Sequence, residues 1–96
     1  MLHLIFQSPI ELALLERIVS GDDVVFLENA VLRILAKGSL CTRLMQCLEQ
    51  NRLYVLADDL EVRGIAVSEL VTGIEVIDYA GLVALTVKNP VIQSWS

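Results

Sequence analysis

Hydrophobic residues gather in five short runs along the chain, and the segments between them repeat apolar residues at helical spacing. A short apolar run bounded by turn signals is typical of a strand that is buried on both faces of a sheet. We therefore predict five strands, at residues 2–6, 24–27, 53–56, 74–77 and 91–95. The intervening patterns predict helices at residues 9–19, 28–36, 39–51, 58–63 and 78–88.

Residues that favour helix ends stand at the boundaries of these segments. Ser8 is suited to cap the first helix, Pro9 fits its first turn, and Glu11 completes a capping box. Asp58 and Asp78 follow the third and fourth strands, where a carboxylate can cap the helix that begins there. The boundaries support the assignment of helices between the strands.

Strands that alternate with helices predict a mostly parallel sheet covered by helices on both faces. The expected fold class is α/β: one small three-layer domain over residues 1–96, with a mostly parallel five-stranded, flavodoxin-like sheet. The chain is too short for a second domain.

The composition adds one feature to this picture, an excess of apolar residues. Hydrophobic residues make up 55% of the chain, above the ~45–50% usual in soluble domains. No run reaches the ~18 apolar residues of a membrane-spanning helix, and the start lacks the pattern of a signal peptide. We therefore expect a cytoplasmic protein, without membrane association, that uses apolar surface to contact other subunits.

The predicted helices 9–19 and 28–36 carry apolar residues over more than the ~100° stripe of an ordinary surface helix. A tightly packed three-layer core would explain either helix alone. Two such helices in so short a chain favour an oligomer interface. The candidate interface residues, with two aromatic residues added, are Leu12, Leu15, Val19, Val31, Leu35, Tyr79 and Trp95.

Charge and turn composition argue against nucleic acid and nucleotides as direct ligands. The formal net charge is −5, and the basic residues are scattered singly rather than gathered in a stripe that would release counterions from a phosphate backbone. The turns contain no glycine-rich phosphate loop. We expect no cofactor and no direct contact with nucleic acid.

Candidate chemistry is limited to Cys41, Cys47 and His3. Cys41 follows the expected cap Ser39, where a helix N-terminus favours a thiolate, so it is the one candidate nucleophile; a structural role is the main alternative. Cys47 is expected to pack in the core, and the spacing of the two cysteines excludes a CxxC pair. His3 lies in an apolar strand and is expected to be buried, and no cluster of residues has the spacing of a metal site.

Several segments resemble the TusB/DsrH family in order and spacing, over nearly the whole chain. They are Met1-Leu2-His3 with Ser8-Pro9, Gly21-Asp22-Asp23, Glu28-Asn29-Ala30-Val31, Tyr54-Val55-Leu56-Ala57-Asp58-Asp59-Leu60 with Arg63-Gly64, and Ile77-Asp78-Tyr79-Ala80-Gly81-Leu82-Val83-Ala84-Leu85-Thr86-Val87 with Pro90 and Trp95. The family commonly has a glycine at the position of Ala30. The resemblance implies a DsrE-like fold.

The resemblance also implies a role in a sulfur relay. Family members belong to a heterohexamer of three related subunits in two copies each, here with TusC-like and TusD-like partners, that passes persulfide sulfur to a downstream acceptor protein. The tRNA branch supports 2-thiolation of the wobble uridine. DsrH members carry a cysteine after a Leu-Glu-x pattern, whereas here Leu15-Glu16-Arg17 is followed by Ile18. This departure favours the TusB branch.

Three hypotheses follow. The first is a non-catalytic subunit of a sulfur relay for tRNA 2-thiolation, without a catalytic residue of its own. The second is a sulfurtransferase that carries a persulfide on Cys41. The third is a DsrH-like subunit in sulfur oxidation.

Overall fold

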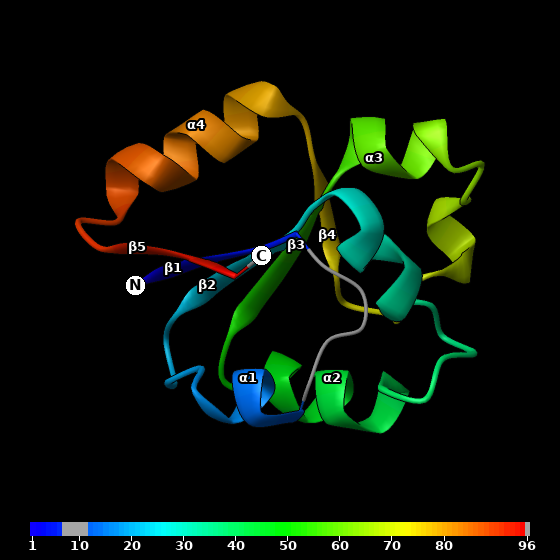
Figure 1. Ribbon diagram of the computed structural model, residues 1–96, viewed down its shortest axis with the longest axis horizontal. Coiled ribbons are helices and arrows are strands. Elements are labelled where there is room, and N and C mark those ends of the chain that lie inside the picture. The colour runs from blue at the N-terminus through cyan, green and yellow to red at the C-terminus, as the bar shows by residue number, and fades with distance from the viewer. Residues whose placement is uncertain (7–11, 96) are drawn as a thin grey trace.

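A computed structural model describes residues 1–6 and 12–95 of the chain, without the side chains of residues 12 and 13. The predicted capping box at Ser8, Pro9 and Glu11 lies outside these residues. The chain forms an α/β domain with one central sheet, which confirms the predicted fold class (Figure 1).

The sheet has five strands, all parallel, in the order β4-β3-β2-β1-β5. The strands are β1 (Leu2–Ile5), β2 (Asp23–Phe26), β3 (Arg52–Leu56), β4 (Glu75–Ile77) and β5 (Ile92–Trp95). Each apolar run of the sequence therefore became a strand. The last strand crosses back to lie beside the first, so the two ends of the chain meet in neighbouring strands.

Helices cover both faces of this sheet. The α-helices are α1 (Leu12–Glu16), α2 (Cys41–Leu48), α3 (Ala57–Val62) and α4 (Tyr79–Lys88), and two 3₁₀ helices are η1 (Glu28–Arg33) and η2 (Val67–Glu69). Figure 1 shows α1 and α2 on one side of the strands and α4 on the other.

The core consists of two clusters because side chains alternate between the faces of each strand. The larger cluster lies on the side of α1 and α2 and includes Phe26 and Val55. The smaller cluster includes Leu2, Val25 and Leu85, the last of which comes from α4. Among the described residues, α4 is the only α-helix that contributes a buried residue to this second cluster. One face of the sheet is thus covered more thinly than the other.

The prediction of a helix over residues 28–36 was wrong in its second half. A 3₁₀ helix ends at Arg33, and Leu35 forms an isolated antiparallel bridge with Leu70. The N–H of Ala36 donates to the carbonyl of Glu69 at 2.8 Å. Pairing with a segment distant in sequence satisfies backbone groups that an α-helix would have bonded internally, and so it stops the helix.

The two predicted carboxylate caps have different outcomes. Asp78 caps α4, since its Oδ1 accepts a hydrogen bond of 2.8 Å from the N–H of Gly81. The prediction for Asp58 was wrong, because α3 begins one residue earlier, at Ala57, with Leu56 at the N-cap position. Asp58 lies instead in the first turn of the helix, where its negative charge interacts favourably with the helix dipole.

Candidate functional site

Cys41, the sequence's candidate nucleophile, is the first residue of α2 and is half-buried. Its neighbours Leu40 and Leu44 are buried in the larger core cluster. Its Sγ lies 3.9 Å from the Sδ of Met45, one turn along the helix. The described residues bring no base or cation within hydrogen-bonding distance of this thiol. No described side chain is therefore placed to act as a base toward the Cys41 thiol.

Cys47 packs against the larger core cluster, as the sequence predicted. Burial raises the pKa of the Cys47 thiol. The positive charge of Arg43 acts to lower this pKa, but its effect is smaller than that of burial. Cys47, Arg43 and Ile18 line the same shallow hollow of about 380 Å³. Ile18, at the position where the resemblance implies a cysteine in DsrH members, thus lies in the same hollow as a thiol whose pKa is raised by burial.

A second hollow of about 210 Å³ lies at the carboxyl ends of the strands, where open α/β sheets bind their ligands. Its walls are mostly apolar and include Phe6, Leu56 and Tyr79, with carboxylates from Glu28 and Asp59. Among the described residues that line it, the phenol of Tyr79 is the only thiol, imidazole or hydroxyl group. Its chemistry suits contact with an apolar group better than catalysis.

Polar contacts hold the rim of this second hollow. Glu28 has a φ of 51°, in the left-handed region that a residue with a side chain seldom adopts. Its N–H donates to the carboxylate of Asp59 at 2.8 Å. Arg63 lies 3.6 Å from that carboxylate and donates to Asn29 at 3.0 Å. These contacts fasten η1 to α3 and hold the unusual backbone at Glu28.

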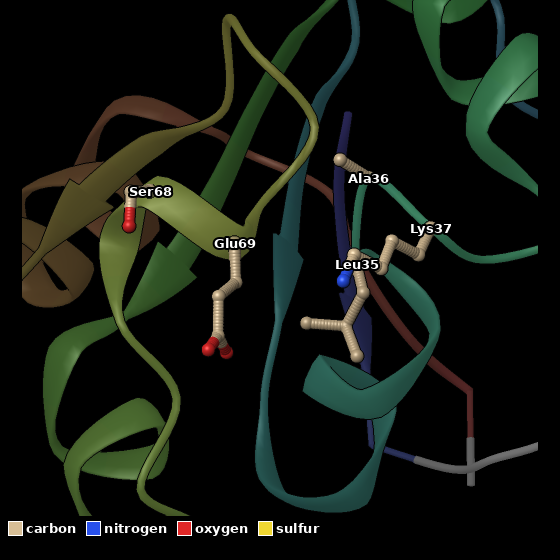
Figure 2. Close-up of a pocket in the computed structure, with 5 residues that line it drawn as sticks. All are labelled: Leu35, Ala36, Lys37, Ser68 and Glu69. Carbon is tan, nitrogen blue, oxygen red and sulfur yellow. The ribbon is translucent and has the colours of Figure 1, made fainter.

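A third hollow, of about 370 Å³, lies between the segment after η1 and η2. Figure 2 shows Leu35 and Lys37 on one side of it and Ser68 and Glu69 on the other. Two of its lining residues, Lys37 and Glu69, carry opposite charges. It lies beside the Leu35–Leu70 bridge, and its described lining residues include no thiol and no imidazole.

His3 is 2% exposed, so the prediction that it is buried is confirmed. It belongs to a buried polar network. Its Nε2 lies 2.9 Å from Oδ2 of Asp22, and the indole N–H of Trp95 donates to its Nδ1 at 3.1 Å. Because an indole nitrogen can only donate, Nδ1 must be unprotonated and Nε2 must carry the proton. His3 is therefore a neutral imidazole that donates to Asp22.

Asp22 also accepts hydrogen bonds from the N–H of Val19 at 3.0 Å and from the N-terminal ammonium at 3.3 Å. Burial acts to raise the pKa of this carboxyl, but the contacts with His3, Val19 and the ammonium outweigh it and leave the pKa lowered. The network joins β1, the turn before β2 and the end of β5. It is structural, because the imidazole has no access to solvent.

The seven candidate interface residues have different environments. Leu15 and Val31 are buried in the chain's own core, so both are unavailable for contact with another subunit. Leu35 is half-buried in the bridge region, whereas Val19 and Tyr79 are 66% and 59% exposed. The side chain of Leu12 lies outside the described residues.

Trp95, the last of the seven, is half-buried, and its side chain contacts other residues of the same chain. Its ring stacks on His3 at a centroid distance of 6.2 Å, and the guanidinium of Arg17 lies 5.8 Å from its centroid. The sequence offered no signal for this arrangement, since Trp95 and His3 stand 92 residues apart. Only the crossing of β5 back to β1 brings them together.

Two further findings limit the classes of site. Within residues 1–6 and 12–95, no three His, Cys, Asp or Glu side chains gather as metal ligands would. None of the described helices has the length and apolar character required to cross a membrane.

Comparison with known proteins assigns the chain to a family. The profile of the family described as "DsrH like protein" matches residues 7–91. Proteins named "Protein TusB" from Serratia proteamaculans and Pectobacterium parmentieri are 36% and 35% identical to the chain over 98 residues. Each alignment covers 99% of this chain and 100% of the relative. A third relative with that name, from Erwinia tasmaniensis, is 32% identical over the same extent.

Two solved structures share the fold at low sequence identity. A protein of unknown function, MTH1491, from Methanobacterium thermoautotrophicum has a TM-score of 0.78 at 12% identity, covering 98% of this chain and 96% of that one. The ychN protein from E. coli has a TM-score of 0.73 at 13% identity, covering 98% and 97%. These likenesses bear on the fold alone.

Proposed function

The chain belongs to the DsrH/TusB family and has its DsrE-like fold, and we propose that it is a non-catalytic subunit of a sulfur relay that supports 2-thiolation of the wobble uridine of tRNA. In this proposal it works in the cytoplasm, in a heterohexamer with two homologous subunits. One of those subunits, rather than this chain, carries the persulfide. The full-length similarity to proteins named TusB is the observation that carries the proposal.

The state of the thiols supports a non-catalytic role. Sulfur transfer needs a thiolate that donor and acceptor can both reach. Ile18 stands where the family resemblance places a cysteine, and an isoleucine cannot carry sulfur. The neighbouring Cys47 has a raised pKa because it is buried. Cys41 is half-buried and has no basic partner among the described residues.

The three hollows support the same proposal. Among the described residues that line them, none pairs a nucleophile with a base at hydrogen-bonding distance, as nucleophilic catalysis requires. The hollow at the carboxyl ends of the strands is mainly apolar, which suits a contact with another protein.

The test is to replace both thiols in cells that lack the native chain. Cys41→Ser together with Cys47→Ser is expected to leave the 2-thiouridine content of tRNA unchanged. Affinity purification of the variant should recover the two homologous subunits in constant stoichiometry. Subunit abundance is measured in parallel, because either substitution can reduce stability where the thiol is packed.

The outcomes separate the hypotheses. Loss of 2-thiouridine with a normally assembled complex would show that this chain carries sulfur, and Cys41→Ser alone would then identify the carrier. A chain whose deletion leaves tRNA thiolation intact would refute the proposed pathway. In that case the DsrH-like role in sulfur oxidation would be the one to examine.

A further inference from the structure

The hollow at the carboxyl ends of the strands carries one charge that the described residues leave unbalanced. Two carboxylates line it, those of Glu28 and Asp59. The Asp59 carboxylate accepts a hydrogen bond of 2.8 Å from the N–H of Glu28 and lies 3.6 Å from Nη1 of Arg63. The exposed carboxylate of Glu28 forms no ion pair with a described residue. The rim of the hollow therefore presents one negative charge to a ligand.

The backbone fixes the place of this charge. Glu28 is the one described residue other than glycine with a positive φ, at 51°. A glycine would adopt this conformation without the steric cost that a side chain adds. The hydrogen bond to Asp59 holds the strained backbone, and Arg63 in turn holds Asp59. A strained residue that its neighbours keep in place, while its own side chain stays unpaired, indicates a use for that side chain.

The walls of the hollow are apolar and partly aromatic. Leu4, Phe6 and Leu82 are half-buried and pack against the smaller core cluster, on the thinly covered face of the sheet. Tyr79 at the start of α4 adds a second aromatic ring and is 59% exposed. A hydrocarbon chain gains free energy when it leaves water for walls of this kind. Aromatic rings beside a carboxylate also favour an organic cation.

The volume of the hollow limits the occupant to about one long side chain. The hollow measures about 210 Å³. A water molecule in the liquid uses roughly 30 Å³, so the hollow has space for on the order of seven non-hydrogen atoms. An arginine side chain contains about that number and ends in a planar cation. A nucleotide or a dinucleotide cofactor is several times too large.

We propose that this hollow receives an arginine side chain of a partner protein, with the hydrocarbon stem between the apolar walls and the guanidinium on the carboxylate of Glu28. Arginine fits better than lysine, because a guanidinium is more weakly hydrated, stacks on aromatic rings and pairs with a carboxylate through two hydrogen bonds. The net charge of −5 also favours the approach of a basic segment. The inference deepens the proposed function, and its choice of a protein as the source of the guanidinium rests on that function.

Binding of small probes to the purified chain, followed by NMR, tests the site. The probes n-butylguanidinium, n-butylammonium and the uncharged n-butylurea share a hydrocarbon stem and differ in the polar head. We expect n-butylguanidinium to bind with a Kd on the order of 1–10 mM, as is usual for so small a ligand, and to shift the amide signals of Glu28 and Leu82. The ammonium probe should bind about threefold more weakly, because it neither stacks nor pairs through two hydrogen bonds. The urea should bind about tenfold more weakly, because it carries no charge.

Two variants separate the carboxylate of Glu28 from the fold. Glu28→Gln keeps the size of the side chain and removes its charge. Glu28→Gly also removes the backbone strain and keeps the N–H that donates to Asp59. Both variants should weaken binding of n-butylguanidinium at least fivefold, while Glu28→Gly unfolds at about the same urea concentration as the wild type. Glu75→Gln removes an exposed carboxylate of β4 outside the hollow, and this matched control should bind the probe like the wild type.

A charge reversal tests the contact within the complex. Glu28→Lys is expected to lower the recovery of a homologous subunit or of the acceptor protein at least tenfold in affinity purification, whereas Glu75→Lys leaves it unchanged. Equal binding of the three probes, tighter binding of the ammonium probe, or full recovery of every partner with Glu28→Lys would overturn the inference. The probe measurement involves no tRNA. Absence of probe binding therefore refutes this site and leaves the proposed function standing, whereas failure of the proposed pathway leaves probe binding intact.

Discussion

Asp22 fastens the start of β1 to the turn before β2, and its removal is expected to destabilise the fold strongly. The carboxylate accepts from His3, Val19 and the N-terminal ammonium. Asp22→Ala removes these contacts at once. It also leaves the buried Nε2–H of His3 without an acceptor.

The magnitude follows from the burial of the network. A hydrogen bond to a charged group contributes about 1.5–3 kcal/mol, and a buried donor left unsatisfied costs about 1–3 kcal/mol. The contact with the ammonium is partly exposed and adds little. We therefore expect Asp22→Ala to lower the free energy of unfolding by about 3 kcal/mol. For a domain of this size that corresponds to a fall in Tm of roughly 12–24 °C.

Thermal and urea unfolding measure this loss, with Asp58→Ala as the control. Asp58 is an exposed carboxylate in the first turn of α3. Asp58→Ala therefore changes the net charge by the same amount as Asp22→Ala, but it removes at most a small favourable interaction with the helix dipole. If the two variants unfold within about 1 kcal/mol of each other, the network contributes no more than a surface charge. The structural role that we assign to His3 and Asp22 would then be refuted.

The pH dependence provides a second readout. The pKa of Asp22 is lower in the folded chain than the ordinary value of about 3.9. Its stabilising contribution is therefore complete above that ordinary value and is lost as the pH falls through the lowered one. The difference in stability between the wild type and Asp22→Ala should be constant from pH 7 to about pH 5 and should shrink on further acidification. A difference that grew on acidification would contradict the sign of the shift.

Three further predictions concern the helix cap, a turn and RNA. Asp78→Ala should lower the free energy of unfolding by about 1 kcal/mol in urea unfolding, because α4 loses its cap, whereas Asp78→Asn should lose much less. Gly73→Ala should cost about 1–2 kcal/mol, because φ is +107° and an added Cβ would lie 3.0 Å from Leu48 Cδ1; Gly64→Ala, which meets nothing within 4 Å, should cost less. The isolated chain should show no tRNA binding at physiological salt in a filter-binding assay, because its net charge is −5; tight, salt-sensitive binding would contradict this.

Local patterns in the sequence determined the sheet and most of the helices. Each of the five predicted runs formed a parallel strand, and the most continuously apolar of them became the inner strands, which are covered on both faces. The outer strands β4 and β5 include polar residues and are more exposed. The cap at Asp78 was equally local, since the side chain bonds a backbone group three residues away. His3 is buried, as its place in an apolar strand predicted, and Cys47 is half-buried against the larger core cluster.

The tertiary structure decided the features that depend on distant partners. The helix expected over residues 28–36 stops at Arg33 because the backbone of the following residues pairs with the segment around Leu70. The sequence near Leu35 contains no signal that predicts this bridge. Leu15 and Val31 became core, while the outer face of α4 stayed exposed, although all these segments are similarly apolar in sequence. Trp95 reaches His3 only because β5 returns to pair with β1. Hydrophobicity determines that a residue prefers burial, but the packing of the whole chain decides which apolar residues are buried within it and which stay exposed.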